Sequence, residues 1–137
     1  MGETMTEATN ENLQILLTKL MGDRFCSGEI SDVDACIQNF VPQSSDGSWI
    51  DRSLQRRGMK KCEPYQDAAR RCMDDEKKQK SVFKAAAAFP SCREERKTLE
   101  MCRLHGKSDC EQEALDVLFC GMVGLVQKLR EKQNHRQ

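Results

Sequence analysis

Four stretches of this chain share one outline: CSGEISDVDAC at residues 26–36, CEPYQDAARRC at 62–72, CREERKTLEMC at 92–102 and CEQEALDVLFC at 110–120. In each stretch nine residues separate two cysteines, and together the stretches contain all eight cysteines of the chain. Ten residues along an α-helix rise about 15 Å in close to three turns, so both sulfur atoms lie toward one side of the helix. Two such helices packed antiparallel would bring their cysteines together in two pairs.

The residues between the cysteines also favour helices. The seventh residue after each first cysteine is apolar and lies about two helical turns along, nearly in phase with the cysteine: Val33, Ala69, Leu99 and Val117. A zinc site would need closely spaced ligands such as CxxC, which the sequence lacks, and neither His105 nor His135 has a ligand-like spacing. We therefore expect structural disulfides, no metal and no cofactor.

The composition makes disulfides important for folding. Leucine, isoleucine, valine and phenylalanine make up 26 of the 137 residues, near the level at which a chain has too little apolar surface to fold. A disulfide offsets such a deficit, by about 3 kcal/mol for a loop of moderate length, because it restricts the unfolded chain. We expect the bridges to decide whether this chain folds.

Disulfides indicate an oxidising compartment. Residues 1–12, MGETMTEATNEN, are polar and acidic and do not have the pattern of a secretory signal. The mitochondrial intermembrane space fits both observations. The alternative is a reduced helical protein whose cysteines serve as small core residues.

Breaker residues and apolar periodicity divide the chain into four parts. We expect a flexible tail, an amphipathic helix, a first hairpin with a long loop and an extended helix, and a second hairpin with a C-terminal helix, at residues 1–12, 13–25, 26–89 and 90–137. Ser31, Ser91 and Ser108 are expected to cap helices. The run from Tyr65 to Phe89 predicts one long helix, because it is rich in strong helix formers.

Apolar residues recur at helical spacing on both sides of the cysteine stretches. We expect the stripe before the first stretch to pack on a hairpin, with docking to another subunit as the alternative. A second stripe continues past the last cysteine. Trp49, in the presumptive linker 41–58, is expected to cover the open end of a hairpin or to contact a partner. The candidate interface residues are Leu13, Leu16, Leu17, Leu20, Trp49, Met122, Val126 and Leu129.

Two disulfide pairings are open. Only RLHGKSD separates the last two stretches, which predicts a compact hairpin, and pairing in sequence order gives Cys26–Cys72, Cys36–Cys62, Cys92–Cys120 and Cys102–Cys110. The rival register contains Cys62–Cys102 and Cys72–Cys92 and leaves the first and last stretches to pair with each other. We favour the sequential scheme, because neighbouring elements usually pack together.

The repeated spacing resembles the twin CX9C, or CHCH, family of mitochondrial proteins over roughly residues 25–121, and four motifs are typical of quadruple-CX9C accessory subunits of respiratory complex I. The resemblance implies an all-α fold of two disulfide-stapled antiparallel hairpins (a double CHCH arrangement), here with N-terminal and C-terminal helical extensions. It also implies import by the disulfide relay of the intermembrane space. Leu99 and Phe119 match the family's apolar residues near a docking cysteine.

No constellation for catalysis stands out. The sequence has no CxxC or CPC redox pair, no nucleophile–base pattern, no Gly-rich phosphate loop, and none of the adjacent cysteines that copper-delivering members of the family use. The formal net charge is zero, whereas nucleic-acid binders usually have a basic excess. We therefore expect neither an enzyme nor direct binding to nucleic acid.

These observations predict a non-catalytic accessory subunit of a respiratory complex, with complex I favoured, peripheral to the inner membrane on its intermembrane-space side. Its partners would be other subunits of that large complex. The first alternative is a mitochondrial ribosome component or an assembly factor of the same family. The second is a myristoylated membrane-organising scaffold, because Gly2 and Thr6 match the acceptor pattern MGxxx[ST].

Overall fold

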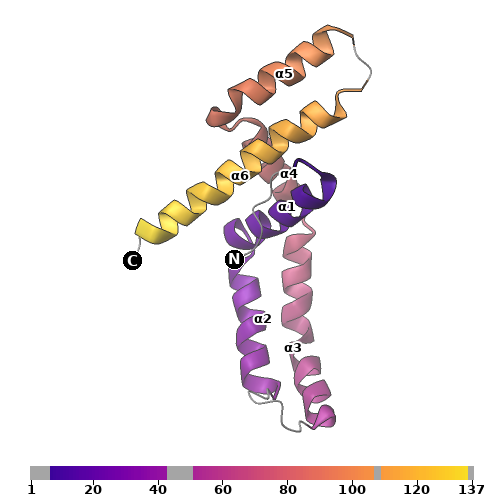
Figure 1. The fold of residues 1–137 in the computed structure, drawn as a ribbon. Helices are drawn as coiled ribbons and strands as arrows, with labels where there is room; N and C mark the ends of the chain where they lie inside the picture. Colours follow the sequence, from indigo (N-terminus) through magenta and orange to yellow (C-terminus); the bar gives the residue numbers. More distant parts are fainter. Residues whose placement is uncertain (1–6, 43–50, 107–108, 136–137) are drawn as a thin grey trace. The chain divides into compact units, whose positions relative to one another are not determined.

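The computed structural model describes residues 7–42, 51–106 and 109–135 of the chain. The described residues form helices and no strand, which confirms the expected all-α class (Figure 1). The chain divides into two compact units: one is Arg24–Asp75, and the other combines Met1–Asp23 with Glu76–Gln137. Each unit contains two of the four disulfides, and none of the bridges joins one unit to the other.

The unit Arg24–Asp75 is an antiparallel pair of helices, α2 (Ser27–Phe40) and α3 (Arg52–Met73), which lie side by side in Figure 1. The helix α3 begins inside the predicted linker, because the Asp51 carboxylate accepts hydrogen bonds from the backbone N–H groups of Ser53 and Leu54 at 2.9 and 3.4 Å. Near this end Gly58 is buried against the backbone of Phe40 and Val41. The two helices therefore approach each other at backbone distance.

The second unit is built around the longest helix, α6 (Glu111–His135). The helix α5 (Arg93–Leu104) follows a single 3-10 turn, η1 (Pro90–Cys92), and runs antiparallel to α6 (Figure 1). The helix α4 (Glu76–Ala87) also packs on α6, where Gly121 lies against the backbone of Ala86. The segment before α1 (Asn10–Arg24) is tied to α6 by a hydrogen bond that the Gln112 side chain donates to the Ala8 carbonyl.

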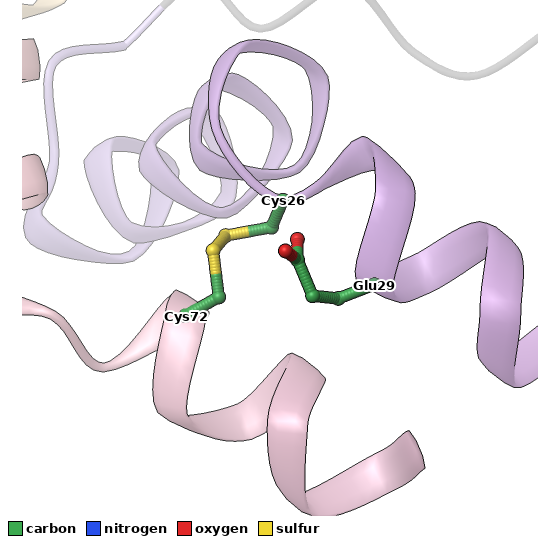
Figure 2. Close-up of side chains that lie close together, drawn as sticks. All are labelled: Cys26, Glu29 and Cys72. Carbon is green, nitrogen blue, oxygen red and sulfur yellow. A yellow bond between two sulfur atoms is a disulfide. The ribbon is translucent and has the colours of Figure 1, made fainter.

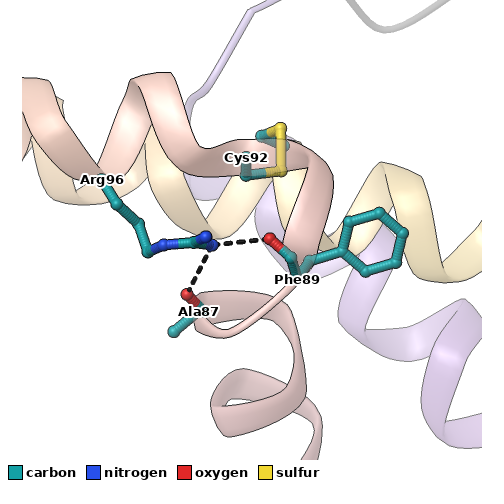
Figure 3. Close-up of a disulfide and its surroundings, with 5 residues drawn as sticks. Ala87, Phe89, Cys92 and Arg96 are labelled. Atoms are coloured by element: carbon teal, nitrogen blue, oxygen red, sulfur yellow. Dashed lines mark hydrogen bonds between the residues drawn. A yellow bond between two sulfur atoms is a disulfide. The ribbon is translucent and has the colours of Figure 1, made fainter.

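A single arginine holds the connection between α4 and α5. The Arg96 guanidinium donates hydrogen bonds to the carbonyl oxygens of Ala87 and Phe89, at 3.3 and 2.6 Å (Figure 3). Both carbonyls belong to the end of α4 and the residues after it, where helical hydrogen bonds stop and backbone acceptors need other partners. The contact fixes the turn that leads into Cys92.

The prediction of one long helix from Tyr65 to Phe89 is wrong. The helix α3 ends at Met73 and α4 begins at Glu76, in the other unit. Between them lie Asp74 and Asp75, which are poor helix formers and whose negative charge is unfavourable at a helix C-terminus. The same acidic run is favourable at the start of the next helix, so the chain breaks here.

Two of the expected helix caps are also wrong. Ser31 lies inside α2, which begins immediately after Cys26, and α5 has Cys92 rather than Ser91 at its N-cap. Ser108 lies outside the described residues, and Asp109 instead accepts a hydrogen bond from the Glu111 backbone N–H at 3.2 Å. At the starts of α2 and α5 a disulfide-bonded cysteine holds the N-cap position, and no side-chain hydrogen bond caps the helix.

Candidate functional site

The cysteines are the residues that sequence reasoning singled out most clearly, and the structure joins all eight in disulfides. The bonds follow the sequential scheme: Cys26–Cys72, Cys36–Cys62, Cys92–Cys120 and Cys102–Cys110. The paired Cα atoms are 5.9, 5.7, 6.1 and 6.0 Å apart in that order, which is ordinary for a disulfide. Each helix pair is closed by two bridges, whose cysteines are ten positions apart on each helix.

Three of the four motifs begin at the start of a helix. Cys26 and Cys92 are the N-cap residues of α2 and α5, and the Cys110 carbonyl accepts the first helical hydrogen bond of α6, from Ala114. Cys62 differs, because it lies in the middle of α3. The equal intervals in the sequence therefore conceal two kinds of local environment for the first cysteine.

A glutamate lies beside each of the three disulfides whose motif begins a helix. The ligand atoms of Cys26, Glu29 and Cys72 all lie within 4.8 Å of one another, and Figure 2 shows the Glu29 carboxyl group next to that bridge. Sulfur and carboxylate oxygen atoms are equally close in two further groups. One consists of Cys92, Glu95 and Cys120, and the other of Cys102, Cys110 and Glu113. The disulfides thus have acidic neighbours at a repeated position.

Two of these carboxyl groups have a buried oxygen that lacks a hydrogen-bond partner among the described residues. They are the Oε2 atoms of Glu29 and Glu95. Buried polar atoms in folded proteins are nearly always hydrogen-bonded, and each exception needs a physical explanation. A glutamate in the first turn of a helix is favourable for the helix dipole, but that preference does not explain an oxygen without a partner.

Sequence reasoning missed these glutamates, although a signal was present. The three motifs in question begin CSGE, CREE and CEQE, with glutamate three residues after the first cysteine, whereas the remaining motif begins CEPY. Residues three apart are neighbours on a helix face. The pattern C-x-x-E, read together with the CX9C spacing, places a carboxyl group next to a sulfur atom.

The apolar residues proposed as an interface are mostly covered within the chain. Six of them are buried, namely Leu13, Leu16, Leu17, Leu20, Met122 and Val126, and Leu129 is half-buried. These side chains are covered within the chain, because α1 and the C-terminal half of α6 turn their apolar sides inward. Trp49 lies outside the described residues.

Other apolar side chains are exposed. On α5, Met101 is 51 % and Leu104 is 71 % exposed, and the two lie one turn apart. Leu99, a residue that the family resemblance singled out, lines a shallow surface pocket with Leu104. Phe119, the other such residue, lines a hollow of about 670 Å³ with Phe89, Val123 and the Cys92–Cys120 bridge.

No protein-family model, curated protein or solved structure matches this chain. Among the described residues, no helix combines the length and the apolar character needed to cross a membrane.

Proposed function

We propose that this protein is a non-catalytic structural subunit of the twin CX9C (CHCH) type, located on the intermembrane-space side of a respiratory complex of the mitochondrial inner membrane. Complex I is the favoured complex. One observation supports this function above the others: two antiparallel helix pairs, each closed by two disulfides between cysteines with the same spacing. Such a scaffold gains rigidity from its bridges rather than from a large apolar core.

The state of the cysteines suits a structural task in an oxidising compartment. All eight are in disulfides. Six of them are buried, and the other two, Cys110 and Cys120, are half-buried. Buried and paired cysteines are chemically inert, unlike the exposed thiols of redox catalysts. Import by the disulfide relay of the intermembrane space would supply these bridges as the chain folds.

The exposed pair on α5 is the surface that we propose for contact with a neighbouring subunit. Met101 and Leu104 are large apolar side chains that the chain itself leaves open to solvent. Charged residues accompany them, because Arg103 and Glu100 line the adjacent pocket. An apolar centre with a charged rim is the usual anatomy of a protein–protein contact.

Complexome profiling tests this function. Gently solubilised mitochondria are separated by native electrophoresis, and mass spectrometry along the lane locates the protein. Comigration with a respiratory complex is expected. Comigration with ribosomal proteins, or migration alone at low mass, would contradict the proposal and favour a ribosomal component or an assembly factor.

A matched pair of variants tests the contact surface. Met101→Gln with Leu104→Gln removes the apolar pair on α5 and should abolish comigration, while circular dichroism of the purified protein stays unchanged. The control Ile30→Gln alters an exposed apolar residue on α2 and should comigrate like the wild type. Comigration of the double variant at the wild-type level would exclude this surface.

A further inference from the structure

The carboxyl groups of Glu29 and Glu95 lie where a metal ion could use them, provided that the neighbouring sulfur atoms are thiolates. In each case a carboxylate oxygen lies within 4.8 Å of both sulfur atoms of one disulfide. In both glutamates one buried carboxylate oxygen has no hydrogen-bond partner among the described residues. Two sulfur atoms and one carboxylate oxygen are three ligands of the kinds that Zn²⁺ accepts.

We propose that the reduced form of this chain binds Zn²⁺ at two sites, Cys26–Glu29–Cys72 and Cys92–Glu95–Cys120. In each site two thiolates and one carboxylate oxygen would coordinate the ion, and water would complete the tetrahedron. The closed disulfide excludes this state, because its sulfur atoms bear no charge. Each of these two cysteine pairs can therefore be joined in either of two ways, by a disulfide bond or by a shared metal ion.

The chemistry balances with a phosphine as the reductant. The phosphine breaks the S–S bond, takes up the oxygen atom of one water molecule as phosphine oxide, and leaves two thiols that hold the two hydrogen atoms of the water. Binding of Zn²⁺ then releases the two thiol protons to solvent. No further electron transfer occurs, because zinc is not redox-active.

The folded arrangement places the three ligating atoms of each site close together. Adjacent ligands of a tetrahedral zinc ion lie about 3.3–3.8 Å apart for metal–ligand distances of about 2.0–2.3 Å, and the present ligand atoms lie within 4.8 Å of one another. The helix N-terminus at Cys26 and at Cys92 also favours a thiolate over a thiol. In the reduced chain the two sulfur atoms are no longer bonded, so they can separate to this distance as the metal binds and the helices re-form.

The bridge Cys36–Cys62 provides an internal comparison. The residue three positions after Cys62 is Tyr65, and within the described part of the chain no carboxylate forms a three-ligand group with these two sulfur atoms. Reduced, this pair offers two ligands only. Glu113 does lie near the Cys102–Cys110 bridge, but it has no buried oxygen without a partner, so the proposal is confined to the two outer bridges.

The test is an anaerobic titration of the full-length chain, reduced by a phosphine, with Co²⁺ as the spectroscopic substitute for Zn²⁺. Two equivalents of Co²⁺ should produce thiolate-to-cobalt charge-transfer absorption and tetrahedral d–d bands, and added Zn²⁺ should bleach both. Far-ultraviolet circular dichroism should show helix returning as the metal binds. Failure to produce the charge-transfer band would overturn the proposal.

Variants separate these sites from unspecific binding to cysteines. The double variant Glu29→Gln with Glu95→Gln should lower the affinity for Co²⁺ at least tenfold, whereas the control Glu63→Gln with Glu94→Gln, at exposed positions close to the same motifs, should leave it unchanged. Replacing Cys36 and Cys62 by serine should preserve two equivalents. Equal affinity of the Glu29/Glu95 variant and the wild type would show that thiols alone bind the metal, which contradicts the proposal.

Discussion

At the scale of single residues, close contacts of glycine decide how near the helices approach. A Cβ atom at Gly121 would overlap with the backbone of Ala86, and one at Gly58 would overlap with the backbone of Phe40. Backbone atoms cannot rotate away as a side chain can. The two glycines therefore permit the packing of α4 on α6 and of α2 on α3, respectively, and no other residue type fits at these points.

Gly121→Ala should destabilise the protein by about 1–3 kcal/mol, because the added methyl group forces α4 away from α6. Urea unfolding of the oxidised protein measures the change. The control is Gly28→Ala in α2, where a Cβ atom would meet nothing within 4 Å. Alanine is the better helix former, so the control should gain up to about 1 kcal/mol. Equal behaviour of the two variants would refute the close packing at Gly121.

Arg96→Lys should loosen the connection between α4 and α5, because the Nη1 atom of Arg96 donates both hydrogen bonds, to Ala87 and to Phe89, and the lysine nitrogen ends one bond short of that position. A hydrogen bond from a charged donor contributes about 1.5–3 kcal/mol, and we expect the lower part of that range since the pair is only partly buried. Hydrogen exchange of the amides in residues 88–92 should accelerate. The control Arg93→Lys, exposed on the same helix, should not change their exchange.

At the scale of secondary-structure elements, disulfides determine how the helices pair. The two inner bridges close chain segments of different length: Cys36 and Cys62 are 26 positions apart, whereas Cys102 and Cys110 are 8 apart. Loop-closure entropy grows with the number of residues enclosed, although slowly. The two helix pairs should therefore depend on their inner bridges to different degrees.

Replacing Cys36 and Cys62 by serine should cost about 3.5 kcal/mol, and replacing Cys102 and Cys110 about 2.5 kcal/mol, from the loop lengths of 26 and 8 residues. Urea unfolding of the two double variants, each with its other bridges intact, gives both values. Each variant serves as the control for the other, because both lose one bridge and gain two hydroxyl groups. A larger loss for the shorter loop would contradict the entropic account.

At the scale of the whole molecule, the covalent bonds compensate for a small apolar core. The described core consists largely of leucine, methionine, valine and the cysteines themselves, and no polar or charged residue is fully buried among the described residues. Domains of this size are stable by only about 5–15 kcal/mol. Four bridges of about 3 kcal/mol each are comparable with that total.

Complete reduction should therefore unfold most of the metal-free chain at room temperature. The measurement is far-ultraviolet circular dichroism before and after treatment with a phosphine in the presence of a chelator, and we expect a large loss of helical signal. Alkylation without prior reduction is the control, and it should label none of the eight cysteines, because all are in disulfides. Retention of the helical signal after reduction would show that the apolar core suffices.

The sequence by itself determined the helical class and the stapled architecture, because a ten-residue interval puts two sulfur atoms on one side of a helix. It left two disulfide registers open, and only the tertiary structure decided for Cys72 pairing with Cys26 rather than with Cys92. Spacing along one helix contains no information about which other helix faces it. The choice depends on packing between segments that lie far apart in the chain.

Tertiary structure also decided which side chains are covered and what surrounds each sulfur atom. The stripe that includes Leu16 and Leu20 is equally compatible with an internal contact and with a partner surface, and burial assigns it to the interior. The proximity of Glu29 to Cys72 depends on the pairing of α2 with α3, so no local pattern could establish it. A helical period determines which residues share a face, whereas their neighbours across the interface are determined by the fold.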